Sequence, residues 1–388
     1  MEFVTAGESH GPALTAIVTG VPAGVRVDED AINADMARRQ KGYGRGGRML
    51  IETDRAIVQS GVRFSTTMGT PVTLQVVNAD HANWAGRMDV FGEAPADLKR
   101  EVQPRPGHAD LVGMLKTDTD DARNILERSS ARETAARVAA GGIAKAFLAE
   151  LGVTVTSYVK RIGSVELPVL PCAAALDAAA VAAIEASECR CPDAATTDAM
   201  KAEIDAAKAA GESLGGECVV VVNGLIPGLG SYNSGPARLT SQLGGACFAI
   251  PAIKGVEFGM GFETAARPGS QVHDGIVYSA SAGYTRTSNN AGGLEGGMTT
   301  GAPLVITLAM KPIPTLMKPL DTVNTDTHEP VKASKERSDT CAVPAMGVVA
   351  EAEVAMVLAD AYTQMFGDNC LADILERRDA YLARIAKR

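Results

Sequence analysis

The stretch from Phe3 to Gly20, "FVTAGESHGPALTAIVTG", sets the kind of fold that the chain can adopt. Its centre, "GESHG", has the G-x-S-x-G spacing that in hydrolases places a nucleophilic serine on a sharp turn between a strand and a helix. Here the β-branched run "LTAIVTG" follows the turn, so the pattern predicts two strands joined by a turn. Because the helix is missing, a nucleophilic Ser9 is disfavoured. Some other chemistry must account for a serine directly beside His10.

Beyond this hairpin the chain mixes helical and strand patterns. Four apolar residues recur four apart, as in a helix: Ala139, Ile143, Phe147 and Leu151. Gly141 and Gly142 interrupt this helix at a cost of about 1 kcal/mol each relative to alanine, which indicates that another backbone packs closely there. A second long helix is predicted near residues 345–366, and "GGECVVVVNG" predicts a buried strand. Without strict alternation of strand and helix, an α+β fold is favoured over a doubly wound sheet.

The composition disfavours several classes of protein. The chain has 388 residues, 46% of them hydrophobic, seven cysteines and a net charge of −9. The negative charge and the 4% of aromatic residues disfavour nucleic-acid binding. The odd number of scattered cysteines disfavours a disulfide framework, and no apolar run approaches the roughly 20 residues of a membrane span. We therefore expect a soluble, cytoplasmic protein with neither membrane nor nucleic-acid partners.

Residues 165–214 form an alanine-rich, acidic segment. The pattern predicts two short helices around Pro192, and we interpret the segment as a solvated insertion. Within it, Cys189 and Cys191 form a lone C-x-C without a second pair or a nearby histidine, so no metal site is predicted.

A basic, glycine-rich run extends from Arg38 to Arg48, with no acidic residue between Met36 and Ile51. Glycine lets backbone N–H groups approach an anion closely, and arginine grips carboxylate or phosphate at two points. The run therefore indicates an anion site, while a solvated basic loop remains the alternative.

The segment "ERSSARETAARV" begins the long helix, with Ser130 and Glu133 in the S-x-x-E spacing of a capping box. Arg128 and Arg132 then lie near the helix N-terminus, where a cation opposes the helix dipole and a bound anion would be favoured. An anionic ligand explains these arginines. The alternative is that Glu133 simply pairs with an arginine.

Two further loops carry candidate residues. In "RPGHAD", His108 lies between Arg105 and Asp110, a setting that suits either acid–base chemistry or a structural hydrogen bond. In "ERSD", residues 336–339, an arginine and an acid precede the last long helix and could either bind a ligand or neutralise each other.

Taken together, eight segments in this order resemble the chorismate synthase family: "GESHGPAL", "RRQKGYGRGGRMLIETD", "RPGHAD", "ERSSARETAARVAAGGIAK", "AIKGVEFGMGF", "NNAGGLEGGMTTGAP", "MKPIPT" and "ERSDTCAVPA". The resemblance runs from Phe3 to beyond Met365, and only residues 165–214 are expected to fall outside it. It implies one domain over residues 1–388, built as a β-α-β sandwich with helices packed between antiparallel sheets. It also implies a homotetramer.

The resemblance implies a lyase of the shikimate pathway, which supplies aromatic amino acid biosynthesis. The family converts 5-enolpyruvylshikimate 3-phosphate to chorismate by a 1,4-anti elimination of phosphate, and it requires reduced FMN although no net redox change occurs. The hydrogen that leaves is barely acidic, so a base alone faces a high barrier and the flavin lends an electron. NADPH is implied as a candidate reductant.

The resemblance also implies roles for individual residues. His10 would protonate the leaving phosphate, His108 would stabilise the reduced flavin, and Asp339 would assist proton movement. The implied substrate-binding residues are Ser9, Arg39, Arg45, Arg48, Arg105, Ser130, Arg132, Arg337 and Ser338. Arg39 and Arg45 are also the implied NADPH contacts. The implied FMN contacts are Arg128, Ser129, Ser130, Pro251, Ala252, Gly296, Lys311, Pro312, Ile313, Pro314, Thr315 and Arg337.

One departure from the family pattern concerns Pro251, which stands where an amide side chain is common and offers neither a side-chain donor nor a backbone N–H. Two other functions remain open. A phosphate-ester enzyme could use the same anion sites without flavin, and a noncatalytic binding protein would bind substrate without turnover.

Overall fold

The computed structural model describes residues 1–46, 53–168, 176–336 and 338–388. The candidate site residues Arg48 and Arg337 lie outside the described residues. The predicted hairpin is confirmed: β1 (Glu2–Ala6) and β2 (Ala13–Thr19) pair antiparallel around the "GESHG" turn.

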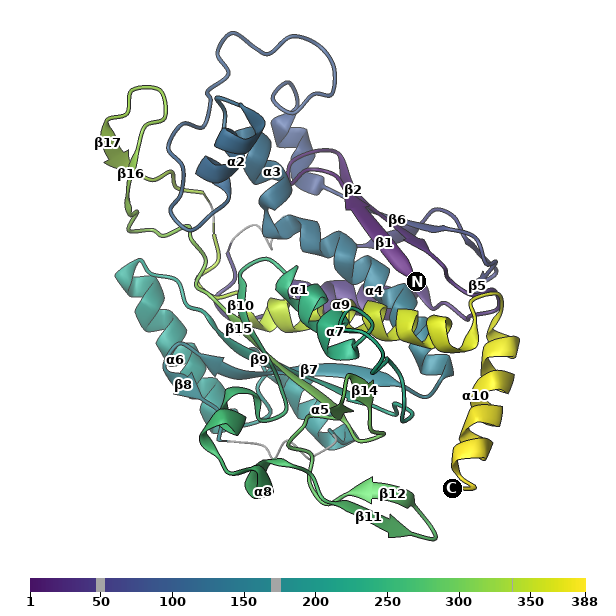
Figure 1. Ribbon diagram of the computed structural model, residues 1–388. Coiled ribbons are helices and arrows are strands. Elements are labelled where there is room, and N and C mark those ends of the chain that lie inside the picture. The colour runs from purple at the N-terminus through teal and green to yellow at the C-terminus, as the bar shows by residue number, and fades with distance from the viewer. Residues whose placement is uncertain (47–52, 169–175, 337) are drawn as a thin grey trace.

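Two antiparallel sheets form the outer layers of the molecule (Figure 1). The first has the order β1-β2-β6-β3 and is completed by β6 (Val72–Val77) and β3 (Ala56–Val58). The second has the order β10-β15-β9-β7-β8. Its strands are β10 (Ile253–Phe258), β15 (Leu304–Met310), β9 (Gly216–Asn223), β7 (Thr154–Ile162) and β8 (Val165–Glu166).

Helices fill the space between these sheets. They are α1 (Glu29–Gln40), α4 (Thr134–Glu150), α7 (Leu239–Phe248) and α9 (Val343–Phe366). The α4 helix packs on β2 and β6 of the first sheet, α9 packs on β7 and β9 of the second, and the two helices pack against each other. This arrangement confirms the predicted α+β sandwich. The α9 helix is buried on almost every side because it lies in the middle layer.

The close approach predicted at the glycine pair of α4 is confirmed. A Cβ atom at Gly141 would lie only 2.3 Å from Cβ of Ala352 in α9, and one at Gly142 would lie 2.9 Å from a side-chain carbon of Ile32 in α1. The glycines therefore let three helices share the middle layer.

The segment 165–214 is helical, as predicted, with α5 (Ala178–Ala186) and α6 (Ala194–Ala210) on either side of Pro192. The interpretation of this segment as solvated is wrong on its inner face. Five of its side chains are essentially inaccessible to solvent and join the common core: Ile184, Cys189, Cys191, Met200 and Ile204. Alanine-rich composition concealed this face because only a few larger apolar residues mark it.

The remaining elements surround the sandwich. The further helices are α2 (Asp110–Thr117), α3 (Arg123–Ser129), α8 (Gly269–Val272) and α10 (Leu371–Ile385), with 3₁₀ turns at Ala79–Trp84, Ala131–Glu133 and Gly261–Ala266. Short hairpins are formed by β4 (Val62–Arg63) with β5 (Thr66–Thr67), β11 (Ile276–Ser279) with β12 (Gly283–Arg286), β13 (Leu294–Glu295) with β14 (Met298–Thr299), and β16 (Asp321–Val323) with β17 (Pro330–Lys332).

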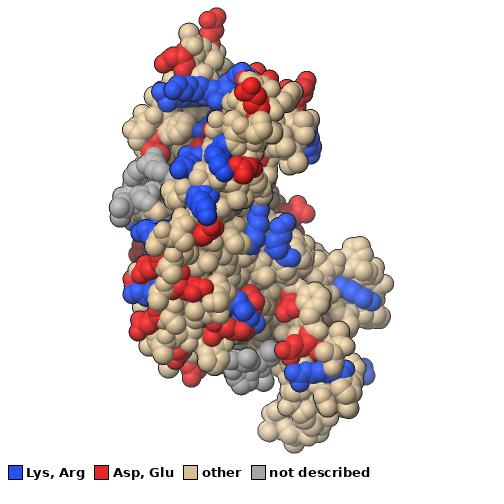
Figure 2. Space-filling view, turned by 90° about the vertical axis from the view of Figure 1, so that its left-hand side faces the viewer, with Lys and Arg blue, Asp and Glu red and all other residues tan. Residues whose placement is uncertain are grey.

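Two surface features bear on the expected partners. Within the described ranges, no helix combines the length and the apolar character that crossing a bilayer requires. On the face shown in Figure 2, Lys and Arg side chains lie interspersed with Asp and Glu side chains. That face therefore presents no uniform basic field to a polyanion.

Candidate active site

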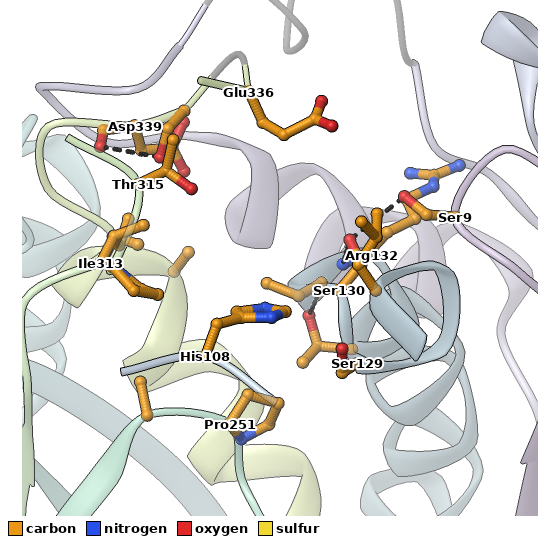
Figure 3. Close-up of a pocket in the computed structure, with 18 of the residues that line it drawn as sticks. Ser9, His108, Ser129, Ser130, Arg132, Pro251, Ile313, Thr315, Glu336 and Asp339 are labelled. Atoms are coloured by element: carbon orange, nitrogen blue, oxygen red, sulfur yellow. Dashed lines mark hydrogen bonds between the residues drawn. The ribbon is translucent and has the colours of Figure 1, made fainter. Parts of the chain in front are cut away.

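A cavity of about 420 Å³ opens where the "GESHG" turn, the N-terminal end of α4, the end of β15 and the start of α9 meet. Most of the site residues expected from the sequence line it: Ser9, His10, Arg39, Arg45, Arg105, His108, Ser129, Ser130, Arg132, Pro251, Ala252, Lys311, Ile313, Pro314, Thr315, Ser338 and Asp339. In Figure 3, Ser9, Ser130 and Arg132 face Asp339, Thr315 and Ile313 across the cavity, with His108 and Pro251 between them. Segments far apart in sequence thus form one site.

Of the expected flavin contacts that the structure describes, three do not line this cavity, namely Arg128, Pro312 and Gly296. The Arg128 guanidinium is 44% exposed and donates to the carbonyl oxygen of Thr5 at 2.9 Å. Gly296 lies in the turn between β13 and β14. Both Arg128 and Pro312 are next to cavity-lining residues in the chain, namely Ser129 and Ile313.

His10 is fixed by Glu127 of α3 and by Trp84. Its Nδ1 lies 2.8 Å from Glu127 Oε1, and its backbone N–H donates to Glu127 Oε2 at 2.8 Å. The imidazole stacks on Trp84 with ring centroids 4.0 Å apart. Its Nε2 lies 4.0 Å from the carboxylate of Asp80, which also lines the cavity. Because Nδ1 meets a carboxylate, Nε2 is the nitrogen left to address a ligand.

The surroundings of Ser9 are not those of a catalytic nucleophile. The Ser9 hydroxyl lies 3.1 Å from that of Ser130, and strand β2 rather than a helix follows the turn. The hydrolase interpretation is therefore excluded, as the strand pattern predicted.

The arginines of the basic run are not uncompensated, as the local sequence suggested. Asp54, whose side chain is fully buried, forms ion pairs with both Arg39 and Arg132. Burial raises the pKa of Asp54, but the two arginines outweigh it and the net shift is downward. Burial, together with the neighbouring charges of Arg45 and Arg132, lowers the pKa of Arg39 to about 10. One carboxylate thus serves two guanidinium groups, which leaves this wall of the cavity positively charged.

The contacts at the N-terminal end of α4 differ from the predicted capping box. The Ser130 hydroxyl accepts a hydrogen bond from the Arg132 N–H at 3.3 Å, across the 3₁₀ turn. The Glu133 carboxylate instead pairs with Arg137 at 2.8 Å and accepts from Thr5. The alternative, in which Glu133 pairs with an arginine, is confirmed: its partners are Arg137 and, at 3.5 Å, Arg128.

The loop at residues 105–110 forms a compact ionic cluster. Asp110 accepts from the Arg105 Nε at 2.8 Å and also contacts Nδ1 of His108. Burial raises the pKa of Asp110, but hydrogen bonds from His108 and Arg105 lower it well below its usual range. Arg105 also donates to the Thr315 hydroxyl at 3.1 Å, which joins this loop to the segment after β15. The neighbours that surround His108 in sequence are therefore also its partners in space.

Asp339 lies at the opposite edge of the cavity, where it contacts the basic loop. Its Oδ1 accepts the Gly46 N–H at 2.6 Å, and its Oδ2 lies 3.3 Å from Arg45. Asp339 therefore has its described partners in the basic loop, at Arg45 and Gly46. Arg337 lies outside the described residues.

Sequence reasoning missed three residues that hold the site, Trp84, Glu127 and Asp54. Trp84 is the only tryptophan of the chain, and Glu127 directly precedes the "RSS" motif. Asp54 is the second acidic residue after the basic run, two positions beyond Glu52. None of the three has a spacing that indicates a partner, because each acts on a residue brought near by tertiary packing.

The fold and the cavity are those of an enzyme that acts on a small molecule. A family model described as chorismate synthase matches residues 1–363. The chorismate synthase of Symbiobacterium thermophilum is 53% identical over 393 residues, covering 100% of both chains. That of Bacillus velezensis is 52% identical over 371 residues, covering 95% of both. A crystal structure of a chorismate synthase is similar with a TM-score of 0.80 and 38% identity, covering 100% of this chain and 98% of that chain.

The chain therefore belongs to the chorismate synthase family of carbon–oxygen lyases, which serves the shikimate pathway. The resemblance expected from the eight motifs is confirmed. The expectation that residues 165–214 fall outside the family pattern is wrong, because the matched range includes them.

Proposed function

We propose that this chain eliminates phosphate from 5-enolpyruvylshikimate 3-phosphate in a 1,4-anti fashion to form chorismate. The observation that carries the proposal is the gathering of five cationic side chains around one cavity with His10 and His108. The substrate bears a phosphate and two carboxylates, and planar guanidinium groups suit both. The cations are Arg39, Arg45, Arg105, Arg132 and Lys311.

Two buried carboxylates support the binding of an anionic substrate, because each orients two cationic side chains and neutralises only one charge. Asp54 is shared by Arg39 and Arg132, and Asp110 is shared by Arg105 and His108. Each shared carboxylate fixes two donors in place before a ligand arrives. Such preorganised charge stabilises an anion strongly in a site that excludes water.

His10 would act as the acid for the departing phosphate. Its Nδ1 lies against Glu127, so the other nitrogen can donate a proton to a phosphate oxygen. Ser9 and Ser130, whose hydroxyls lie together, would donate hydrogen bonds to the same ligand. A positioned acid of this kind contributes about 10²- to 10⁴-fold to a rate.

The cavity also suits reduced FMN. A flavin has a flat, largely apolar ring and a phosphate tail, and the cavity has an apolar wall that includes Ile250, Pro251, Met310 and Val349. Burial and the nearby charge of Lys254 lower the pKa of Lys311. A bound phosphate would stabilise the charged ammonium and offset both effects. When bound, reduced flavin supplies an electron that eases departure of the phosphate.

The residues proposed to hold FMN are those that line this part of the cavity: Ser129, Ser130, Pro251, Ala252, Lys311, Ile313, Pro314 and Thr315. Pro251 has no N–H and would contribute by packing. His108, held by Asp110, would place a positive charge beside the reduced ring, and Asp339 would assist proton movement. Arg39 and Arg45 would contact NADPH as the reductant. We further propose a cytoplasmic homotetramer with one domain per chain.

An anaerobic assay with and without reduced FMN tests the proposed function. We expect turnover of 5-enolpyruvylshikimate 3-phosphate only when reduced FMN is present. The same rate without flavin would instead favour a flavin-independent phosphate-ester enzyme. Substrate binding without turnover, unaffected by His10→Ala or His108→Ala, would favour a binding protein.

A further inference from the structure

The α5–α6 segment touches the loop that carries Arg45 although it does not line the cavity. The loop, residues 41–46, leaves the C-terminal end of α1 and reaches the cavity at Arg45 and Gly46. Among the described residues, no member of α5 or α6 lines the cavity. The loop is therefore the direct link between this segment and the cavity.

Tyr43 is the residue at which the loop meets the segment. Its backbone N–H donates to the Glu188 carbonyl at 2.9 Å, and its hydroxyl lies 3.0 Å from each carboxylate oxygen of Asp205 in α6. The Lys201 ammonium lies 4.9 Å from the Tyr43 ring centroid and pairs with Glu188. The hydrogen bond to Asp205 raises the pKa of the Tyr43 hydroxyl, so the phenol remains a donor at neutral pH. Tyr43 is thus held at its backbone, its ring and its hydroxyl.

Gly44 continues the loop through a narrow space between α6 and the chain that enters α9. Its φ of +85° favours glycine, and a Cβ there would lie 2.8 Å from Ile204 and 3.3 Å from Cys341. The Gly44 carbonyl accepts the Thr340 N–H at 2.8 Å. The path of the backbone is therefore set by contacts on both sides.

The next two residues reach the cavity. Gly46 donates its N–H to Asp339 at 2.6 Å, and Arg45 lies 3.3 Å from the same carboxylate. Only three positions separate the Tyr43 contacts from this edge. A displacement of Tyr43 would move the Arg45 guanidinium.

The segment itself is anchored firmly enough to act as a support. Glu185 and Arg190, which lie in and just after α5, pair with each other at 2.7 Å. Arg38 of α1 joins Glu185 and the fully buried Glu351 of α9, at 2.8 Å each, and Arg190 lies 3.3 Å from Glu351. The support is therefore part of the core, close to the point where the loop begins.

We infer that Tyr43 is a positioning residue, and that the α5–α6 segment is the support against which it holds Arg45 and Gly46 at the Asp339 edge of the cavity. The inference rests on the proposed function only in taking Arg45 to bind an anionic ligand. A loop set in advance spares the ligand the entropy of ordering it. Loss of the support therefore weakens binding in ground and transition states alike, and raises KM while kcat changes little.

A double-mutant cycle on the Tyr43–Asp205 contact tests the inference with the full-length holoenzyme. In Tyr43→Phe and in Asp205→Ala we expect KM for the substrate to rise about two- to tenfold, the range of one net hydrogen bond, with kcat within about twofold. The double variant should be no worse than either single variant. Asp205→Asn keeps an acceptor and should retain the KM of the wild type. Lys208→Ala, an exposed substitution on the same helix, is the matched control.

Several results would overturn the inference. One is a melting temperature lowered by Tyr43→Phe with KM unchanged, which indicates a role in stability alone. Another is a pair of single effects that simply add. Amide hydrogen exchange at residues 43–46, measured without substrate, should be faster in Tyr43→Phe than in Lys208→Ala, and equal rates would also contradict the inference. If the wild type fails to convert the substrate, the proposed function is wrong, while the exchange rates still decide the role of Tyr43.

Discussion

The Glu127 carboxylate holds His10 at two points, the backbone N–H and the ring Nδ1, each at 2.8 Å. The Glu127 backbone carbonyl also accepts the Ser9 N–H at 3.0 Å. One residue of α3 therefore holds both Ser9, at its backbone, and His10 of the "GESHG" turn. Burial raises the pKa of Glu127, but the hydrogen bond and charge of His10 lower it overall, so an ionised carboxylate faces the imidazole.

We predict that Glu127→Gln slows the single-turnover rate about tenfold to a hundredfold, less than the full loss of a general acid. An amide presents one N–H face and cannot accept from both His10 donors. Stopped-flow measurement with preformed reduced flavin gives this rate. The double variant His10→Ala/Glu127→Gln should be no slower than His10→Ala, and a further large loss would show that Glu127 acts independently of His10.

Arg132 is predicted to contribute to substrate binding as well as to the buried pair with Asp54. In Arg132→Ala we expect substrate binding to weaken by about 2–5 kcal/mol, the usual effect of removing a buried, hydrogen-bonded charge. Arg39 still pairs with Asp54 in this variant, which limits the loss of stability. Isothermal titration calorimetry measures the dissociation constant of the substrate for the variant and for the wild type. Arg55→Ala, an exposed control with a guanidinium 3.8 Å from Glu29, should bind normally. A dissociation constant within twofold of the wild type would make Arg132 purely structural.

We predict that the protein loses stability in acid because of the buried carboxylate of Glu351. Burial raises its pKa, but Lys145, Arg38 and Arg190 outweigh burial, and the pKa lies well below its usual range. A carboxyl with a lowered folded-state pKa stabilises the protein above its unfolded-state pKa, and this stability is lost as the pH falls through the folded-state value. The free energy of unfolding should therefore fall below about pH 4.5.

The variant Glu351→Gln isolates this contribution. It leaves buried cations without their charge partner and should cost about 3–5 kcal/mol at pH 7. Urea unfolding at pH 7 and pH 4 should show that the variant depends less on pH than the wild type. Parallel pH profiles for the two proteins would rule out Glu351 as the group responsible.

Gly141→Ala should destabilise the protein because its Cβ would lie 2.3 Å from Cβ of Ala352. Overpacking of this kind costs about 1–3 kcal/mol. The control is Gly245→Ala in α7, where a Cβ meets nothing within 4 Å. That substitution should stabilise the helix by about 1 kcal/mol. Thermal unfolding compares the two, and a stabilising Gly141→Ala would contradict the packing of α4 against α9.

The sequence by itself determined the main elements of the sandwich and pointed to many of the residues that line the cavity. Alternating β-branched residues specify β1 and β2, and the spacing of apolar residues specifies α4 and α9, because these patterns express which face of one element is buried. The cavity residues were implied in a different way, by the resemblance of the eight motifs to the chorismate synthase family. His108 could even be placed beside Asp110, since both lie in one short loop.

Only the tertiary structure decided how the charges are paired. Asp54 meets Arg132, and Glu127 meets His10, across more than seventy positions of sequence, and no periodicity records such pairs. The same holds for the α5–α6 segment, whose buried face carries few large apolar residues and whose contact with Tyr43 joins distant parts of the chain. Local patterns reflect burial of one element's face, whereas ion pairs depend on how separate elements pack, so the partners of the site cations emerge only in the folded chain.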